Sequence, residues 1–143
     1  MSKKRIALYV ILALVAVFLL IQLVPYGRDH TNPPVVQEPV WDSPQTEALA
    51  RAACYDCHSN EVVWPWYSNI APISWLVQRD VDEGRQRVNF SEWNRRQDVR
   101  EMAEIVQEGE MPPLQYKIMH KSGQLSASER AALAQGLQAT VGR

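Results

Sequence analysis

Cys54-Tyr55-Asp56-Cys57-His58 is the stretch of this sequence that decides its fold, because it carries the pattern C-x-x-C-H. Two cysteines three residues apart near the end of a helix can reach the two vinyl groups on one edge of a porphyrin. The next residue, a histidine, can then give its imidazole nitrogen to the iron. The pattern is typical of c-type haem attachment. It predicts one haem c per chain, attached through Cys54 and Cys57, with His58 as the proximal iron ligand.

Two cysteines at this spacing could also serve other purposes. A thiol redox site of this spacing expects a thioredoxin-like βαβ pattern, which the sequence does not show. A structural zinc site usually needs four ligands, whereas the chain has two cysteines and, apart from His58, only the isolated His30 and His120. A disulfide between residues so close would close a very short loop and contribute little stability. Haem attachment is therefore the favoured interpretation.

A long apolar run lies near the N-terminus. Residues 6–24 are interrupted only by Tyr9 and Gln22, and as a helix they would span roughly 28 Å, close to the hydrocarbon thickness of a bilayer. The basic residues of Lys3-Lys4-Arg5 in front of the run predict a cytoplasmic N-terminus. A cleaved signal peptide is the alternative, but the run is long for one and no A-x-A-like site follows it. We therefore expect a single-pass anchor in a bacterial inner membrane, with the rest of the chain in the periplasm or outside.

Three parts are expected along the chain. Residues 1–25 would form a basic cytoplasmic tip and the transmembrane anchor. Residues 26–42, which hold three prolines and no helical period, would form an extended linker. Residues 43–143 would form the haem-binding domain.

Helical periodicity dominates that domain, and no segment alternates convincingly as a strand would. Ser43-Pro44 suits the start of a first helix that runs into Cys54. A second helix is expected to bury one apolar face and to end at Gly84; that face comprises Ile73, Leu76, Val77 and Val81. The predicted fold class is all-α, a small cytochrome-c-like helical domain around one haem, preceded by a single transmembrane helix.

Two further helices complete the expected domain. Ser91 is a candidate cap for a third helix that would end at Gly109 and Pro112-Pro113. Its apolar residues are Val99, Met102, Ala103 and Val106. Ser126 and Glu129 have the spacing of a capping box. They would open a last helix whose apolar residues are Leu133, Leu137 and Val141.

Met111 is the candidate for the sixth iron ligand. It lies in Gly109-Glu110-Met111-Pro112-Pro113, a proline-stiffened loop after a helix, and a thioether ligand raises the reduction potential of a haem. Met102 instead fits the apolar face of its helix and reads as core. Met119 and His120 are rivals, and His120 would make a bis-histidine centre.

Aromatic side chains follow the cysteine motif and could wall the haem. Trp64 and Tyr67 are the candidates for cofactor contact, because an indole N–H and a phenol hydroxyl can hydrogen-bond haem propionates. Ordinary core packing explains Trp64, Trp66, Tyr67 and Trp75 equally well. Arg79, Arg85 and Arg87 could pair with propionates, although a solvated helix face also accounts for each of them.

The charge balance excludes one class of partner. The chain has 15 basic and 16 acidic residues, and without Lys3, Lys4 and Arg5 the remainder carries about -4. A mildly acidic domain lacks the basic footprint of a nucleic-acid-binding protein. The expected partners are the membrane and a redox protein that the sequence does not identify.

The ordered motifs together resemble a known family. Residues 54–60 (CYDCHSN), 64–68 (WPWYS), 89–93 (NFSEW) and 109–112 (GEMP) look like the blocks of the bacterial haem-binding domain family of cytochrome-c-like proteins. The resemblance covers the chain from about Ser43 onward. It implies a compact helical c-type haem domain, often behind one N-terminal membrane segment. It carries attachment onto Cys54 and Cys57 and iron ligation onto His58 and, less directly, Met111.

Electron transfer is the predicted function, since iron with both axial positions filled leaves little room for a substrate. The protein is expected to be a carrier and not an enzyme. The alternative is a haem-based sensor or a small peroxidase, which would need an open or displaceable sixth ligand.

Overall fold

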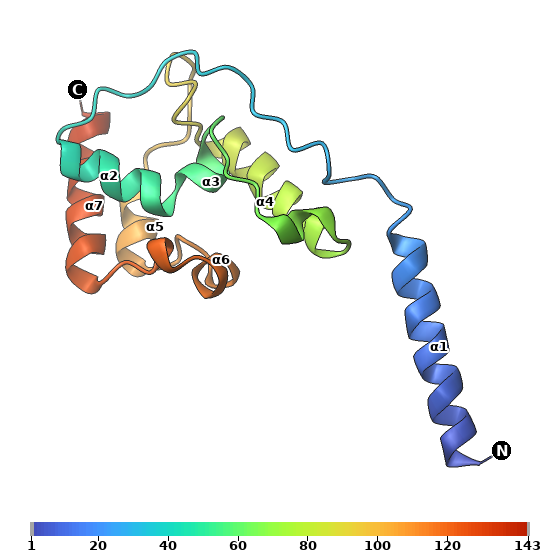
Figure 1. The fold of residues 1–143 in the computed structure, drawn as a ribbon. Helices are drawn as coiled ribbons and strands as arrows, with labels where there is room; N and C mark the ends of the chain where they lie inside the picture. The colour runs from blue at the N-terminus through green and yellow to red at the C-terminus, as the bar shows by residue number, and fades with distance from the viewer. Residues whose placement is uncertain (1, 143) are drawn as a thin grey trace. The chain divides into compact units, whose positions relative to one another are not determined.

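A computed structural model describes residues 2–142 of the chain (Figure 1). Within these residues every regular element is a helix and no strand is present, which confirms the predicted all-α class. The α-helices are α1 (Lys3–Ile21), α2 (Pro44–Ala53), α3 (Tyr55–His58), α4 (Ile73–Arg87), α5 (Met102–Glu108), α6 (Leu114–Met119) and α7 (Ala127–Val141). Two short 3-10 helices are η1 (Trp66–Asn69) and η2 (Lys121–Gly123).

The chain forms two compact units, which are described separately. Unit 1 comprises Met1–His30 and Trp64–Asp80, and unit 2 comprises Thr31–Val63 and Val81–Arg143. The cysteine motif belongs to unit 2, together with most of the helices.

Helix α1 of unit 1 is apolar and buries none of its side chains inside the protein. It is long and apolar enough to cross a membrane, as predicted. An exposed apolar surface of this extent is unfavourable in water. The helix therefore suggests a membrane anchor or a secretion signal.

The core of unit 2 forms where α7 packs against α5 and α2. Leu133 and Leu137 of α7 are fully buried there, beside Val106 of α5 and Ala50 of α2. Gly136 allows a close approach, because a Cβ at this position would overlap the side chain of Thr46. The expected core positions of the third and last helices are thus confirmed, except that Val141 is exposed.

The predicted helix caps are confirmed at two places. The Ser43 side chain accepts a hydrogen bond from the backbone N–H of Thr46 (3.2 Å), and Pro44 occupies the first helical position. Ser126 and Glu129 form the complete capping box at the start of α7. Gly109 ends α5 in the left-handed conformation, with a φ of 82°.

Three expectations about helix ends and faces are wrong. Gly84 does not end the second helix, because α4 continues to Arg87. Ser91 caps no helix; α5 begins only at Met102, and Ser91 is buried in a loop. Ile73 and Leu76 are not core residues, since 44% and 50% of their surfaces are exposed.

The second half of the proline-rich segment is extended but is fixed to unit 2. The backbone N–H groups of Val36 and Gln37 both donate to the carbonyl of Ser91 (2.8 and 3.1 Å), and the N–H of Trp93 donates to the carbonyl of Gln37 (2.8 Å). Residues 31–42 therefore behave as a strap on the helical domain.

Candidate haem site

The cysteine motif occupies a single helical turn directly after α2. Cys54 ends α2, and its carbonyl accepts hydrogen bonds from the N–H groups of Cys57 (3.1 Å) and His58 (2.8 Å). Residues three apart in a helix lie on the same face, so both thiols are presented on one side of the turn. Within residues 2–142 neither cysteine forms a disulfide, and both are half-buried. Burial, with a smaller contribution from Cys57, raises the pKa of the Cys54 thiol to about 12, which keeps this thiol protonated near neutral pH.

Gly84 of α4 permits this turn to lie directly against the helix. A Cβ at Gly84 would overlap the backbone carbonyl and approach the side chain of Cys57. The residue is fully buried inside the continuous α4. Its lack of a side chain is therefore a packing requirement of the cysteine motif and has no role in ending the helix.

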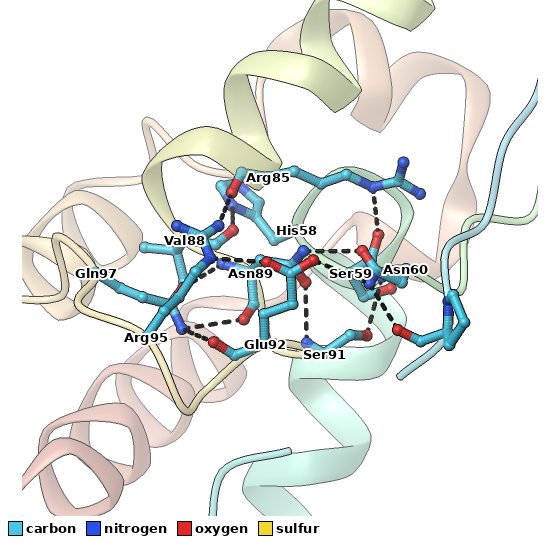
Figure 2. Close-up of polar contacts among 11 residues, drawn as sticks. His58, Ser59, Asn60, Arg85, Val88, Asn89, Ser91, Glu92, Arg95 and Gln97 are labelled. Atoms are coloured by element: carbon cyan, nitrogen blue, oxygen red, sulfur yellow. Dashed lines mark hydrogen bonds and ion pairs between the residues drawn. The ribbon is translucent and has the colours of Figure 1, made fainter. Parts of the chain in front are cut away.

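His58 is held by a hydrogen bond that decides which ring nitrogen is available. Its Nδ1 lies 3.0 Å from the carbonyl oxygen of Val88 (Figure 2). A carbonyl can only accept, so Nδ1 carries the proton and Nε2 keeps its lone pair. Burial lowers the pKa of His58, which favours the neutral ring. A neutral imidazole oriented through its second nitrogen is the usual state of a metal-binding histidine.

A buried polar network surrounds that hydrogen bond (Figure 2). The side-chain amide of Asn89 donates to the Asn60 side-chain oxygen (2.8 Å), and Ser91 N–H donates to the Asn89 side-chain oxygen (2.9 Å). The N–H of Asn60 donates in turn to the Ser91 hydroxyl (2.9 Å). These three residues are almost completely buried. They join the backbone after His58 to the backbone after Val88 and so fix both ends of the histidine hydrogen bond.

Gln97 and Arg85 extend this network. The Gln97 side chain bonds both the N–H and the carbonyl of Asn89, and it also donates to the carbonyl of Glu92 (3.0 Å). Arg85 donates to the Ser59 carbonyl (2.8 Å) and to two acceptors in the strap, Thr31 and Asn32. The Arg85 guanidinium is thus committed to holding the backbone, which leaves it a weak candidate for propionate binding.

The two middle residues of the motif also make specific contacts. The Tyr55 hydroxyl donates to Glu38 of the strap (2.8 Å). The Asp56 carboxylate accepts from the N–H of Val63 (3.1 Å) and from the hydroxyl of Tyr116 (2.8 Å). The last bond joins α6 to the motif across sixty residues of sequence. Sequence reasoning missed it, because nothing in the spacing of a lone tyrosine and a lone aspartate predicts their contact.

Tyr116 is itself firmly placed. Its ring stacks on that of His120 at 4.2 Å between centroids, and a Cβ at Gly123 would overlap it. Burial, followed by the neighbouring Asp56 charge, raises the pKa of the Tyr116 hydroxyl, so the group remains a donor. His120, the rival sixth ligand, also hydrogen-bonds through Nδ1 to the Tyr116 carbonyl (3.3 Å).

Met111 lies in unit 2 with the motif but outside the packed core. Its N–H and that of Glu110 both donate to the carbonyl of Ile105 (3.3 and 3.1 Å), which folds the loop back on the end of α5. Its side chain is 39% exposed. Met102, by contrast, packs against the core cluster, as expected.

Trp64 and Tyr67 belong to unit 1. Trp64 stacks on His30 at 4.6 Å between ring centroids. Its buried indole N–H has no hydrogen-bond partner among residues 2–142. Tyr67 packs edge-on against Trp66. A contact of either residue with haem stays a prediction.

These residues pass a chemical test for a covalently held haem. Two thiols lie on one side of a helical turn, and the next residue is a neutral histidine whose Nε2 keeps its lone pair. In the part of the chain that the structure describes, no group of three or more His, Cys, Asp or Glu side chains could hold a bare metal ion. His58 could offer one nitrogen ligand to an iron that a porphyrin holds.

Comparison with known proteins bears on the same residues. Searches of curated proteins and of solved structures gave no match. A family model described as a haem-binding domain matches residues 16–139, a range that includes every site residue discussed above. This chain therefore belongs to the haem-binding domain family.

Proposed function

We propose that this protein is a membrane-anchored c-type cytochrome that carries one covalent haem and transfers electrons on the periplasmic side of a bacterial inner membrane. The observation that carries the proposal is the hydrogen bond from His58 Nδ1 to the Val88 carbonyl, made by the residue that directly follows Cys57 on the helical turn shared by both cysteines. This arrangement places one imidazole nitrogen and two thiol groups on the same short segment.

Cys54 and Cys57 would attach the haem through its two vinyl groups. Addition of a thiol across a vinyl double bond forms one C–S bond and one C–H bond from the S–H group, so the step needs no oxidant and releases nothing. Two attachments through residues three apart would fix the haem relative to α3. Bound haem would supply a single iron centre that accepts and releases one electron.

His58 would bind the iron through Nε2 on the proximal side. Its hydrogen bond to a carbonyl, and not to a carboxylate, leaves the imidazole only moderately electron-rich. The network of Asn60, Asn89 and Ser91 would keep the ring in place when the iron changes charge. Small rearrangement between oxidation states is the property that an electron carrier needs.

Met111 would bind the iron on the distal side. Support comes from Tyr116, five residues later, whose hydroxyl is hydrogen-bonded to Asp56 inside the cysteine motif. Five residues span at most about 18 Å, so this bond limits how far the backbone of Met111 can lie from the motif. A thioether ligand would raise the reduction potential. Trp64 and Tyr67 remain proposed haem contacts, and the unsatisfied indole N–H of Trp64 would suit a propionate.

One observation favours the second candidate function, a haem-based sensor or small peroxidase. Met111 is partly exposed and is held mainly by backbone hydrogen bonds of its own loop. A ligand of this kind could be displaced by a small molecule. We prefer the electron carrier. His58 is held by its bond to Val88, and the bond from Tyr116 to Asp56 restricts how far Met111 can move from the motif.

The membrane part of the proposal rests on α1. The helix begins with the basic residues Lys3-Lys4-Arg5, and the rest of it, to Ile21, is apolar. A retained anchor with the N-terminus in the cytoplasm would place the haem domain in the periplasm. Intact protein should stay with the membrane fraction, and protease added to spheroplasts should reach the haem domain. A mature N-terminus that begins after residue 24 would show a cleaved signal instead.

Covalent attachment is tested on the full chain expressed with periplasmic cytochrome maturation. Haem should remain with the polypeptide on a denaturing gel and should resist extraction into acidic organic solvent. The variants Cys54→Ser and Cys57→Ser should each leave one attachment and shift the pyridine haemochrome band, and the double variant should lose stained haem. Haem that extracts completely from the wild-type protein would overturn the proposal.

A further inference from the structure

Unit 1 presents apolar side chains to its surface beyond helix α1. Trp66 of η1 is 74% exposed, and Ile73 and Leu76 in the first turn of α4 are 44% and 50% exposed. We refer to these three residues as the Trp66 patch. Ile73 and Leu76 are three residues apart and share a helix face, while Ser74 between them is completely buried. In the first turn of α4 the serine is thus buried, while the two aliphatic side chains are exposed.

The same unit ties this patch to the end of α1. The Gln22 side chain, one residue after the helix, donates to the carbonyl of Ala71 (2.9 Å) and accepts from the N–H of Ala71 (3.0 Å). A second contact lies close by, since Gly27, with a φ of 81°, lets the chain pass so near Ser74 that a Cβ would overlap the Ser74 carbonyl. Two independent contacts therefore hold the start of α4 beside the end of the apolar helix.

This attachment decides the depth of the patch if α1 spans a bilayer. Gln22 would then lie near the outer limit of the hydrocarbon layer, where the headgroup region begins. Ala71 is hydrogen-bonded to the Gln22 side chain, and Ile73 lies two residues after Ala71. The headgroup region is only about 5–8 Å thick on each side. Residues so closely tied to Gln22 cannot stand far from it.

We infer that the Trp66 patch is a membrane-surface contact, by which unit 1 lies on the lipid headgroups at the outer end of α1. The inference rests on the proposed anchor and extends it from a helix that only tethers to a unit that also binds the surface. The chemistry fits, because tryptophan is enriched at the level of the headgroups and aliphatic side chains reach the acyl boundary beneath them. The segment that carries Ile73 and Leu76 is tied to the end of an apolar helix, which points to lipid as the occupant of the patch.

The backbone hydrogen bonds agree with that location. An unpaired N–H or carbonyl group near hydrocarbon costs several kcal/mol, and the Gln22 amide satisfies both groups of Ala71. Gln22 interrupts the apolar run at the position where such a partner is needed. The Gln22 side chain therefore satisfies the backbone hydrogen-bonding groups at the boundary between the helix and the surface-lying segment.

Spin labels on the full-length haem protein in lipid nanodiscs test the inference. Single variants Trp66→Cys, Ile73→Cys and Leu76→Cys receive a nitroxide, with Val15→Cys as the mid-bilayer reference and Glu83→Cys, an exposed acidic residue farther along α4, as the polar reference. The wild-type chain supplies the labelling blank. Collision rates with molecular oxygen, which concentrates in lipid, and with a water-soluble nickel chelate give an oxygen-to-nickel ratio. Power saturation of each label is also recorded under nitrogen. This background value is subtracted, because the haem iron by itself increases the relaxation rate of the label.

The expected ratios at 66, 73 and 76 are higher than that at 83 and lower than that at 15. Ratios equal to that at 83 would place the patch in water and overturn the inference while the anchor stands. Low collision rates with both reagents would show a protein contact, such as a second copy of the chain, and would also overturn it. A water-like ratio at 15 would instead refute the anchor, and the inference with it.

Discussion

The His58 side and the Met111 side of the proposed iron site are built in different ways. His58 is half-buried, its Nδ1 is bonded to the Val88 carbonyl, and the network of Asn60, Asn89 and Ser91 holds the backbone on both sides of that bond. Met111 is 39% exposed and follows a loop whose bonds are mostly local. One long-range bond, between Tyr116 and Asp56, joins the Met111 side to the motif. The difference suggests that the protein prepares the proximal ligand before haem arrives, and that the distal ligand depends on the haem for its final place.

The largest effect is expected from Gly84→Ala, which would disturb the packing of the cysteine motif on the proximal side. The added Cβ would overlap the Cys57 carbonyl, and overpacking of this kind costs about 3 kcal/mol. We expect a large loss of folded holoprotein and a lower urea midpoint. Gly142→Ala is the matched control, since the nearest atom to its Cβ would be Gln138 O at an ordinary 3.4 Å. Equal stability of the two variants would show that α4 does not depend on this approach.

Asn89→Ala tests the buried network and should have the next largest effect. It removes the partner of the Asn60 side-chain oxygen and of the Ser91 N–H, and buried groups left unpaired cost about 2 kcal/mol. Urea unfolding of the holoprotein measures the change. Asn69→Ala, at an exposed position, should alter stability by less than about 0.5 kcal/mol. Similar losses for both variants would argue that the network is not a special support of His58.

Tyr116→Phe tests the long-range bond between the distal side and the motif. Loss of the hydroxyl that donates to Asp56 should cost about 1 kcal/mol. More specifically, the far-red ferric band of methionine ligation should disappear at a lower pH than in the wild type, because the Met111 segment is less restrained. Asp56→Asn keeps an acceptor and should give a smaller shift. An unchanged band in Tyr116→Phe would remove Tyr116 from the account of the distal side.

The capping box of α7 gives the smallest expected effect and a baseline for the other three. Hydrogen bonds from Ser126 lower the pKa of Glu129 below its ordinary value of 4.5. The ionised carboxylate therefore stabilises the folded state above that value, and the contribution is lost as pH falls through the lowered pKa. Glu129→Gln should melt slightly below wild type at neutral pH and together with it in acid. A difference that persists in acid would assign the effect to something other than this charge.

The local features of the fold could be predicted from the sequence, because their causes lie within a few residues. Ser43-Pro44, the Ser126–Glu129 box and Gly109 each determine a helix end through neighbouring backbone groups. The C-x-x-C-H motif predicted haem binding for the same reason, since its three chemical groups are adjacent. The match of the family model to residues 16–139 agrees with that prediction.

Features that depend on distant partners could not be predicted. Glycine is a common helix terminator, but Gly84 is needed for another reason. The backbone of Cys57, twenty-seven residues earlier in the chain, lies so close that a side chain would not fit. Serine is a common helix cap, but the Ser91 hydroxyl instead accepts a hydrogen bond from the N–H of Asn60. Ile73 and Leu76 have the spacing of a core face, yet they lie at the surface of unit 1. In each case the residue type was compatible with the predicted role, but the sequence alone did not show the distant surroundings that determine the actual one.

The ferric absorption spectrum of the holoprotein tests the central claim most directly. If His58 and Met111 bind the iron, the wild type shows the weak far-red band of a methionine ligand. Met111→Ala then loses this band and binds carbon monoxide rapidly in the ferrous state. Met102→Ala should keep the band and lose about 2 kcal/mol of stability, since Met102 packs partly buried against the core. A wild-type protein without the band, or a band abolished by His120→Ala and not by Met111→Ala, would contradict the account.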